Sequence, residues 1–186
     1  MSGEVSPKSL TVALSLTIAL TGCASGVVPL LQSTPSVLRG TPSFVVLPID
    51  FSQLRVGSLD ADEWLAGKSE DQRQSFQHDL EAVNAEFAGH LGEHLGPALV
   101  ATPGPGVFLL RPLMVHWEPG AYFGRAAETR LVLSVLDDRG REVERVEFSA
   151  SQGVDWAHAA SGDRMRSCAR ALGDRAAGYL DERSLR

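Results

Sequence analysis

The chain has little of what would identify a covalent framework or a nucleic-acid partner. It contains only two cysteines, Cys23 and Cys168, and aromatic residues make up 6% of its 186 residues. Two cysteines exclude a disulfide-stapled scaffold. Basic residues are outnumbered, 17 Lys and Arg against 23 Asp and Glu, which gives a net charge of −6. That balance argues against nucleic acid as a partner, because binding to phosphates favours a basic surface.

Familiar catalytic and phosphate-binding motifs are also missing. The sequence has no Gly-x-Ser-x-Gly nucleophile elbow, and its Pro103-Gly104-Pro105-Gly106 segment lacks the Lys-Ser/Thr ending of a P-loop. No catalytic residues and no cofactor are therefore predicted. Hydrophobic residues make up 44% of the chain, which is enough for the core of one domain.

An apolar run from Leu10 to Leu20 follows Lys8 near the N-terminus. It is shorter than the about 20 residues that span a bilayer, and it fits the apolar region of a signal peptide. The next residues, Leu20-Thr21-Gly22-Cys23, resemble a bacterial lipobox. The alternatives are an ordinary secretory signal that happens to contain a cysteine, or a short buried or amphipathic helix.

The lipobox resemblance implies that Cys23 is the acylated first residue of the mature protein. Two or more acyl chains suffice for stable anchoring. By similarity to sorted lipoproteins, Ala24 after the cysteine implies the outer membrane, with the protein facing the periplasm. The predicted organisation is a signal peptide at 1–22, the lipidated cysteine and a flexible tether at 23–42, and one domain at 43–186.

The predicted tether is rich in Ser, Thr, Pro and Gly after Cys23. As a flexible coil, it would span about 24 Å at about 5–6 Å times the square root of its length. Its apolar residues are the exception, and they could lie against the domain or the bilayer: Val27, Val28, Leu30 and Leu31.

Two helices are expected in the domain. Ser69 and Gln72 form a capping box, and Gly96-Pro97 ends the helix that follows. Its apolar stripe has helical spacing: Phe76, Leu80, Val83, Phe87, Leu91 and Leu95. The second helix, Gly162 to Asp181, places Cys168 inside its own apolar stripe, so that this thiol is expected to be buried.

Four extended segments complete the prediction. They are Phe44–Ile49, Val107–Trp117, Thr129–Leu136 and Glu142–Ala150, with a hairpin turn at Asp137-Asp138-Arg139-Gly140 between the last two. The order strand, helix, three strands, helix predicts a two-layer α+β domain. Its sheet is expected to have about four strands, mostly antiparallel, with both helices on one face.

This pattern carries a second resemblance. Phe44–Ile49, the long helix, the Pro103–Val107 segment and the hairpin at 138–140 resemble uncharacterised outer-membrane lipoprotein families with small α/β domains. Related folds serve as accessory subunits of envelope machines. The resemblance implies a fold and a location more than a function.

Two histidines of the first expected helix are the basis of an alternative, enzymatic function. His90-x-x-Glu93-His94 matches an inverted zinc-peptidase motif, in which two histidines share a metal and the glutamate acts as base. A non-catalytic site of Glu86, His90 and His94 is a weaker candidate. His94 follows Phe76 by five whole helical turns, so it is expected to point along the apolar stripe toward the sheet.

The loop after Val107–Trp117 is the better candidate for binding. It contains Trp117, Tyr122, Phe123 and Arg125, the residue types that dominate binding hot spots. The alternative is that these aromatic side chains fold back over the core. The sequence therefore predicts a lipid-anchored, non-enzymatic binding or accessory subunit in transport, secretion or cell-wall assembly, with an envelope protein as partner. The alternative function is a small zinc-dependent hydrolase.

Overall fold

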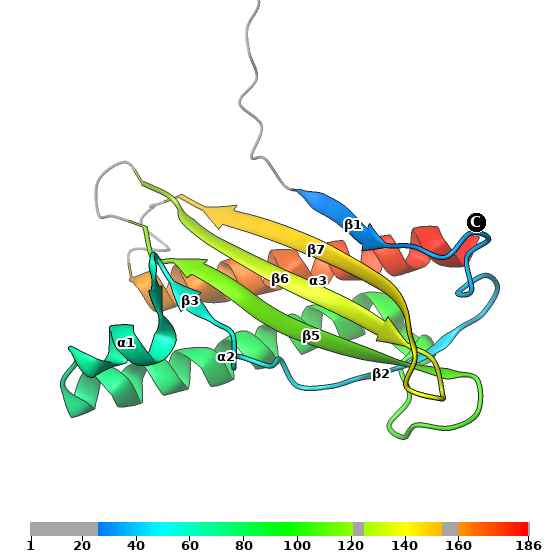
Figure 1. Ribbon diagram of the computed structural model, residues 1–186, viewed down its shortest axis with the longest axis horizontal. Coiled ribbons are helices and arrows are strands. Elements are labelled where there is room, and N and C mark those ends of the chain that lie inside the picture. Colours follow the sequence, from blue (N-terminus) through cyan, green and yellow to red (C-terminus); the bar gives the residue numbers. More distant parts are fainter. Residues whose placement is uncertain (1–25, 121–124, 154–159, 186) are drawn as a thin grey trace, which may run out of the picture.

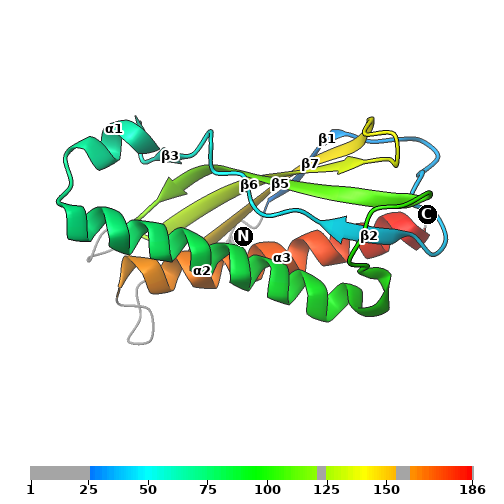
Figure 2. The same ribbon diagram turned by 90° about the horizontal axis from the view of Figure 1, so that it is seen from below.

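The computed structural model describes residues 26–120, 125–153 and 160–185. The chain folds into a mixed sheet with two long helices on one face (Figures 1 and 2). The strands are β1 (Val27–Leu31), β2 (Ser43–Val46), β3 (Arg55–Val56), β4 (Leu59–Asp60), β5 (Val107–Glu118), β6 (Ala127–Leu136) and β7 (Glu142–Gln152). The helices are α1 (Ala61–Ala66), α2 (Glu70–Leu95) and α3 (Ser161–Leu185), with a 3-10 turn at Gly96–Ala98.

The α+β class and the two-layer arrangement are confirmed, but the expected four strands were too few. The sheet has seven strands in the order β1-β7-β6-β5-β3-β4, and β2 pairs with β5 beside β3. Most pairs are antiparallel, whereas β2 and β3 run parallel to β5 at its two ends. β3 and β4 are two residues each, so no alternating pattern could mark them in the polar stretch before α2.

The segment expected to be a flexible tether contains β1. Val27 to Leu31 pair with the outer side of β7, from Phe148 to Arg145, and this makes β1 an edge strand. The backbone of Val27, Val28, Leu30 and Leu31 therefore lies along the domain edge, while their side chains are exposed. The chain joins the sheet at Val27 and, after the loop at 32–42, enters it again at Ser43.

The long helix α2 follows its sequence signals closely. Both hydrogen bonds of the capping box between Ser69 and Gln72 are present. The helix ends at Gly96, which adopts a positive φ of 48°. All six residues of the predicted stripe are buried. Fully burying one such side chain contributes about 1.5–3 kcal/mol, so this face fixes the helix on the sheet. α3 runs four residues beyond its predicted end, to Leu185.

The two long helices cross at a glycine. A Cβ atom on Gly173 of α3 would lie 2.8 Å from the carbonyl oxygen of Phe87 and 3.0 Å from Cβ of His90, both on α2. Gly173 therefore allows a close approach of the two helices. Across the same interface Arg170 makes a bidentate pair with Glu86, with both N···O distances at 2.8 Å.

One charged group lies under the sheet. Glu144 of β7 is fully buried, and its carboxylate accepts hydrogen bonds from Arg183 at 2.5 Å and Tyr179 at 2.7 Å, both on α3. Ser33, just after β1, also donates to Glu144, and its carbonyl oxygen accepts from Arg183. A buried charge needs such partners. The network ties β7, α3 and the segment after β1 together.

Candidate functional site

The two faces of the sheet have different coverings. α2 and α3 lie side by side against one face, as Figure 2 shows. The opposite face carries no long helix in the described part of the chain, and we call it the helix-free face. Alternation along the strands places His116 and Glu118 of β5, Glu128 and Arg130 of β6 and Glu147 of β7 on it.

A β-bulge in β5 determines which side chains near the end of this strand face outward. The pairing with β6 shifts between Met114 and His116, so that Val115 is the additional residue. Met114 and Trp117 consequently both point into the core, whereas His116 lies outward. Without that shift, a regular strand would have turned Trp117 to the outer face.

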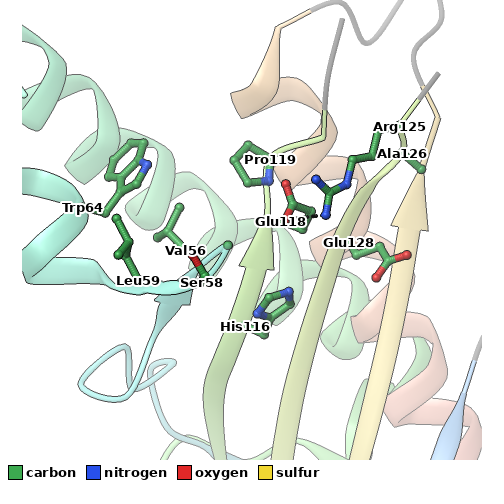
Figure 3. Close-up of a pocket in the computed structure, with 11 residues that line it drawn as sticks. Val56, Ser58, Leu59, Trp64, His116, Glu118, Pro119, Arg125, Ala126 and Glu128 are labelled. Atoms are coloured by element: carbon green, nitrogen blue, oxygen red, sulfur yellow. Dashed lines mark hydrogen bonds and ion pairs between the residues drawn. The ribbon is translucent and has the colours of Figure 1, made fainter. Parts of the chain in front are cut away.

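A hollow of about 720 Å³ opens on the helix-free face near the end of β5. One wall is apolar and comes from the β3–β4 turn and α1, through Val56, Leu59 and Trp64. The other wall is polar. It is formed by His116 and Glu118 of β5, Arg125 just before β6, and Glu128 of β6. Figure 3 shows these two walls on either side of Pro119.

Charge in this hollow is unevenly balanced. Glu118 and Glu128 are direct cross-strand partners in the β5–β6 ladder, and like charges in that arrangement repel. Arg125 pairs with Glu118 at 3.1 Å, while Glu128 has no ion-pair partner within the described ranges. The hollow therefore presents an acidic group that would favour a cation from outside.

His116 lies between these carboxylates and the middle of the sheet. Burial lowers its pKa below the ordinary value, and the positive charge of Arg130 lowers it further. The imidazole is therefore neutral at pH 7 and can both donate and accept a hydrogen bond. It adds a polar contact to the hollow without adding charge.

A second hollow of about 500 Å³ continues along the same face toward β1. Its floor is apolar, with Leu113, Val115 and Val132, and its rim carries Arg111 and Arg145. Arg145 is held by Glu142 at 2.6 Å. The helix-free face thus combines an apolar floor with charged groups of both signs, as protein-binding surfaces do.

The predicted binding loop is only partly on this surface. Arg125 is exposed on the rim of the first hollow, but Trp117 is buried and packs against Phe76 and Trp64, with ring centroids 5.6 and 6.2 Å apart. The alternative of an aromatic side chain folded over the core therefore holds for Trp117. Tyr122 and Phe123 lie outside the described residues.

Two histidines of α2, His90 and His94, make contacts at the interface with α3. His90 and His94 both contact Oδ1 of Asp174 on α3, at 3.0 and 3.1 Å. His94 is exposed and lies on the α3 side, so its predicted direction toward the sheet was wrong. The buried stripe advances by nearly four residues per step, and this turns the sheet-facing side away from His94.

The proposed metal ligands are likewise engaged elsewhere. Glu86 is bound by Arg170, which together with His90 lowers the pKa of the carboxyl group, and Glu93 is exposed. Among the residues that the structure describes, no three His, Cys, Asp or Glu side chains are grouped so that they could hold a metal ion. The His90–His94 segment is accounted for by its contacts with α3.

The two cysteines have separate outcomes. Cys168 is buried in the α3 stripe as expected, and burial raises the pKa of its thiol. Cys23 and the signal segment 1–22 lie outside the described residues, and lipidation stays a prediction. No helix in ranges 26–120, 125–153 and 160–185 has the length and apolarity to cross a membrane.

Sequence reasoning missed Glu128 and the apolar wall formed by Val56 and Leu59. The alternation of β6 contained a signal for Glu128, because Leu131, Leu133 and Val135 face the core, and Glu128 lies at an odd spacing from all three, on the opposite face. The wall had no comparable signal, since it depends on how the β3–β4 turn folds over the end of β5.

No protein family matches the chain, and no curated protein sequence matches it significantly. Several solved structures are similar in fold. They include the PelC dodecamer from Paraburkholderia phytofirmans, at 11% identity and a TM-score of 0.44, with 81% of this chain and 95% of that chain covered.

A protein of the family DUF330 from Xanthomonas campestris is similar at 14% identity and a TM-score of 0.42, with 82% of this chain and 92% of that chain covered. Both similarities concern the fold alone.

Proposed function

We propose that this chain is a lipid-anchored, non-enzymatic binding or accessory subunit of a bacterial envelope system, which docks a protein partner on its helix-free face. The observation that carries the proposal is the division of the sheet. One face is covered by α2 and α3, whereas the other has two hollows, each of which combines apolar side chains with charged ones.

The lipobox at Leu20–Cys23 supplies the anchor in this proposal. Acylation of Cys23 would hold the domain at a membrane, in the periplasm at the outer membrane by similarity to sorted lipoproteins. The role of such a subunit in transport, secretion or cell-wall assembly is to present a surface, which requires a stable fold and an accessible face.

The charges of the first hollow suggest what the partner presents. Arg125 neutralises Glu118, and Glu128 keeps an unbalanced carboxylate. A Lys or Arg side chain of the partner, seated beside Glu128 and against the apolar wall of Leu59 and Trp64, would satisfy both. Tyr122 and Phe123, three and two residues before Arg125, are proposed to add aromatic contacts.

Charge reversal tests the docking face. Glu128→Lys would place a cation where we expect the partner's cation, and co-purification of cross-linked partners from envelope membranes should fall sharply. Glu93→Lys is the matched control, because Glu93 is an exposed carboxylate on α2, away from the sheet. Identical partner recovery with both variants would refute the docking face.

The anchor has its own test. Cys23→Ala should release the protein from membranes into the soluble fraction, while the wild type should be extracted only by detergent. Continued membrane attachment of the variant would refute acylation at Cys23 as the anchor.

A further inference from the structure

We infer that β1 is a membrane-contact strand: its apolar side chains lie in the lipid interface of the bilayer that holds the acyl chains of Cys23. The inference rests on the proposed function, because it requires the anchor. It adds a contact with the bilayer that forms only while the acylated Cys23 holds the domain there, and it defines which edge of the domain faces the lipid.

The first argument is the exposure of β1. Val27, Val28, Leu30 and Leu31 are 43–52% exposed although they belong to an ordered strand. The other exposed large hydrophobic side chains in the described ranges do not share one element: Val37 and Val100 lie in loops, Leu59 on β4 and Leu185 at the end of α3. Single exposed hydrophobic residues are ordinary, but a continuous apolar strip marks a contact surface.

The second argument is the length of chain between β1 and the anchor. Val27 is the fourth residue after Cys23, and four fully extended residues reach at most about 14 Å, at about 3.3–3.6 Å each. An acylated Cys23 has its chains in the bilayer and its backbone at the surface. Val27 must then lie within about 14 Å of the membrane surface. This brings the β1 edge of the domain to the interfacial region, where amphipathic segments bury their apolar side chains about 5–10 Å deep.

The third argument is the way in which β1 is fixed to the domain. It pairs with β7, and the residues that follow it are held by α3: Gln32 donates to Tyr179, Ser33 to Glu144, and the Gly40 N–H to the Ser184 carbonyl oxygen. The strand is therefore a firm part of the surface. A standoff of about 24 Å, expected for a free tether, is not available from Val27 onward.

Lipid fits this strip better than a further strand does. β1 has no charged residue, and Pro29 at its centre has no N–H, so that the edge is a poor template for strand addition. The neutral strip also needs no anionic lipid, which suits a chain with a net charge of −6. Water and lipid headgroups can satisfy the free backbone groups of the edge at interfacial depth.

The experiment uses the acylated full-length protein reconstituted into phosphatidylcholine vesicles. A polarity-sensitive fluorophore is attached at Val28→Cys or Leu30→Cys, with nitroxide-labelled lipids as quenchers. Labelling is selective, because Cys168 is buried and the Cys23 sulfur is occupied by lipid. Leu59→Cys is the matched control: Leu59 is 44% exposed and lies on β4, at the opposite edge of the sheet.

We expect quenching at Val28 and Leu30 to exceed that at Leu59 several-fold. Equal, weak quenching at all three positions of membrane-attached protein would overturn the inference and leave the proposed function intact. Mass spectrometry of the same sample distinguishes failure of the inference from failure of the proposed function, since an unmodified Cys23 would refute the anchor itself. A fluorophore at Val28 that is shielded from water without vesicles would indicate a protein contact and also overturn the lipid assignment.

Discussion

The two faces of the sheet differ in what holds them and in what they leave free. Under α2 and α3, most of the side chains are apolar, and the buried carboxylate of Glu144 accepts hydrogen bonds from Arg183 and Tyr179. On the helix-free face, carboxylates and guanidinium groups share the surface with Leu113 and Val132, and Glu128 is unbalanced. The covered face determines the stability of the domain, and the open face is available for contacts. Changes on the two faces should therefore separate folding from binding.

The largest expected effect is on the covered face, at Glu144. Glu144→Ala leaves Arg183 buried without its carboxylate, and breaking a buried pair in this way costs about 3–5 kcal/mol of unfolding free energy. Urea denaturation measures the loss. Glu147→Ala, on the same strand but the other face, should change stability by no more than about 0.5 kcal/mol. Equal losses would contradict the division between the faces.

The crossing of the two helices comes next. Gly173→Ala places a methyl group against the Phe87 carbonyl oxygen, and such overpacking costs about 1–3 kcal/mol. Gly178→Ala in the same helix meets nothing within 4 Å, so the better helix propensity of alanine should stabilise the protein by up to about 1 kcal/mol. Opposite signs in thermal denaturation would support the close approach at Gly173. A stabilised Gly173→Ala variant would rule it out.

Alkaline pH tests the Glu144 network through the phenol of Tyr179. Burial, together with Glu144, raises the pKa of Tyr179 to about 12, above the about 10 of a free tyrosine. The folded state thus favours the protonated phenol, and its contribution to stability is complete below about pH 10 and is lost as the pH rises toward 12. Tyr179→Phe should show a shallower fall of unfolding free energy over this window. Parallel curves for the two proteins would contradict the assignment.

The smallest effect is expected on the helix-free face. Arg125→Ala removes an exposed ion pair with Glu118, and such pairs contribute about 0–1 kcal/mol. Arg166→Ala, which on the covered side removes contacts to Asp79 of α2 and Asp163 of α3, should lower stability more. Denaturation of both variants tests this ranking. A larger loss at Arg125 would give the open face a structural role.

Local signals predicted most of the long elements. The capping box at Ser69, the stripe of α2 and the Asp137–Gly140 hairpin each rest on neighbouring residues, and all are present. The sequence also contained a signal for Glu144, because it alternates in step with the apolar residues Val146 and Phe148, which face the core. Its burial was overlooked because the compensating Arg183 lies 39 residues further along the chain.

Other features depend on contacts that no local pattern encodes. β1 was not predicted because its apolar residues are exposed. The parallel pairing of β2 was not predicted because its partner, β5, lies beyond α2 in the sequence. In the candidate site, Arg125 was anticipated, whereas the inward turn of Trp117 follows from the β5 bulge. The hollow itself appears only when the β3–β4 turn meets the end of β5.

The contact between Arg183 and the Ser33 carbonyl oxygen joins residues 150 positions apart. A chain made from its amino end cannot form this contact until nearly all of its residues are available, and contacts of such long sequence separation form slowly. The first strand of the sheet is consequently among the last parts to settle. A chain that lacks the final turn of α3 would keep its helices and central strands. The segment after β1 would then lose its contact with Arg183.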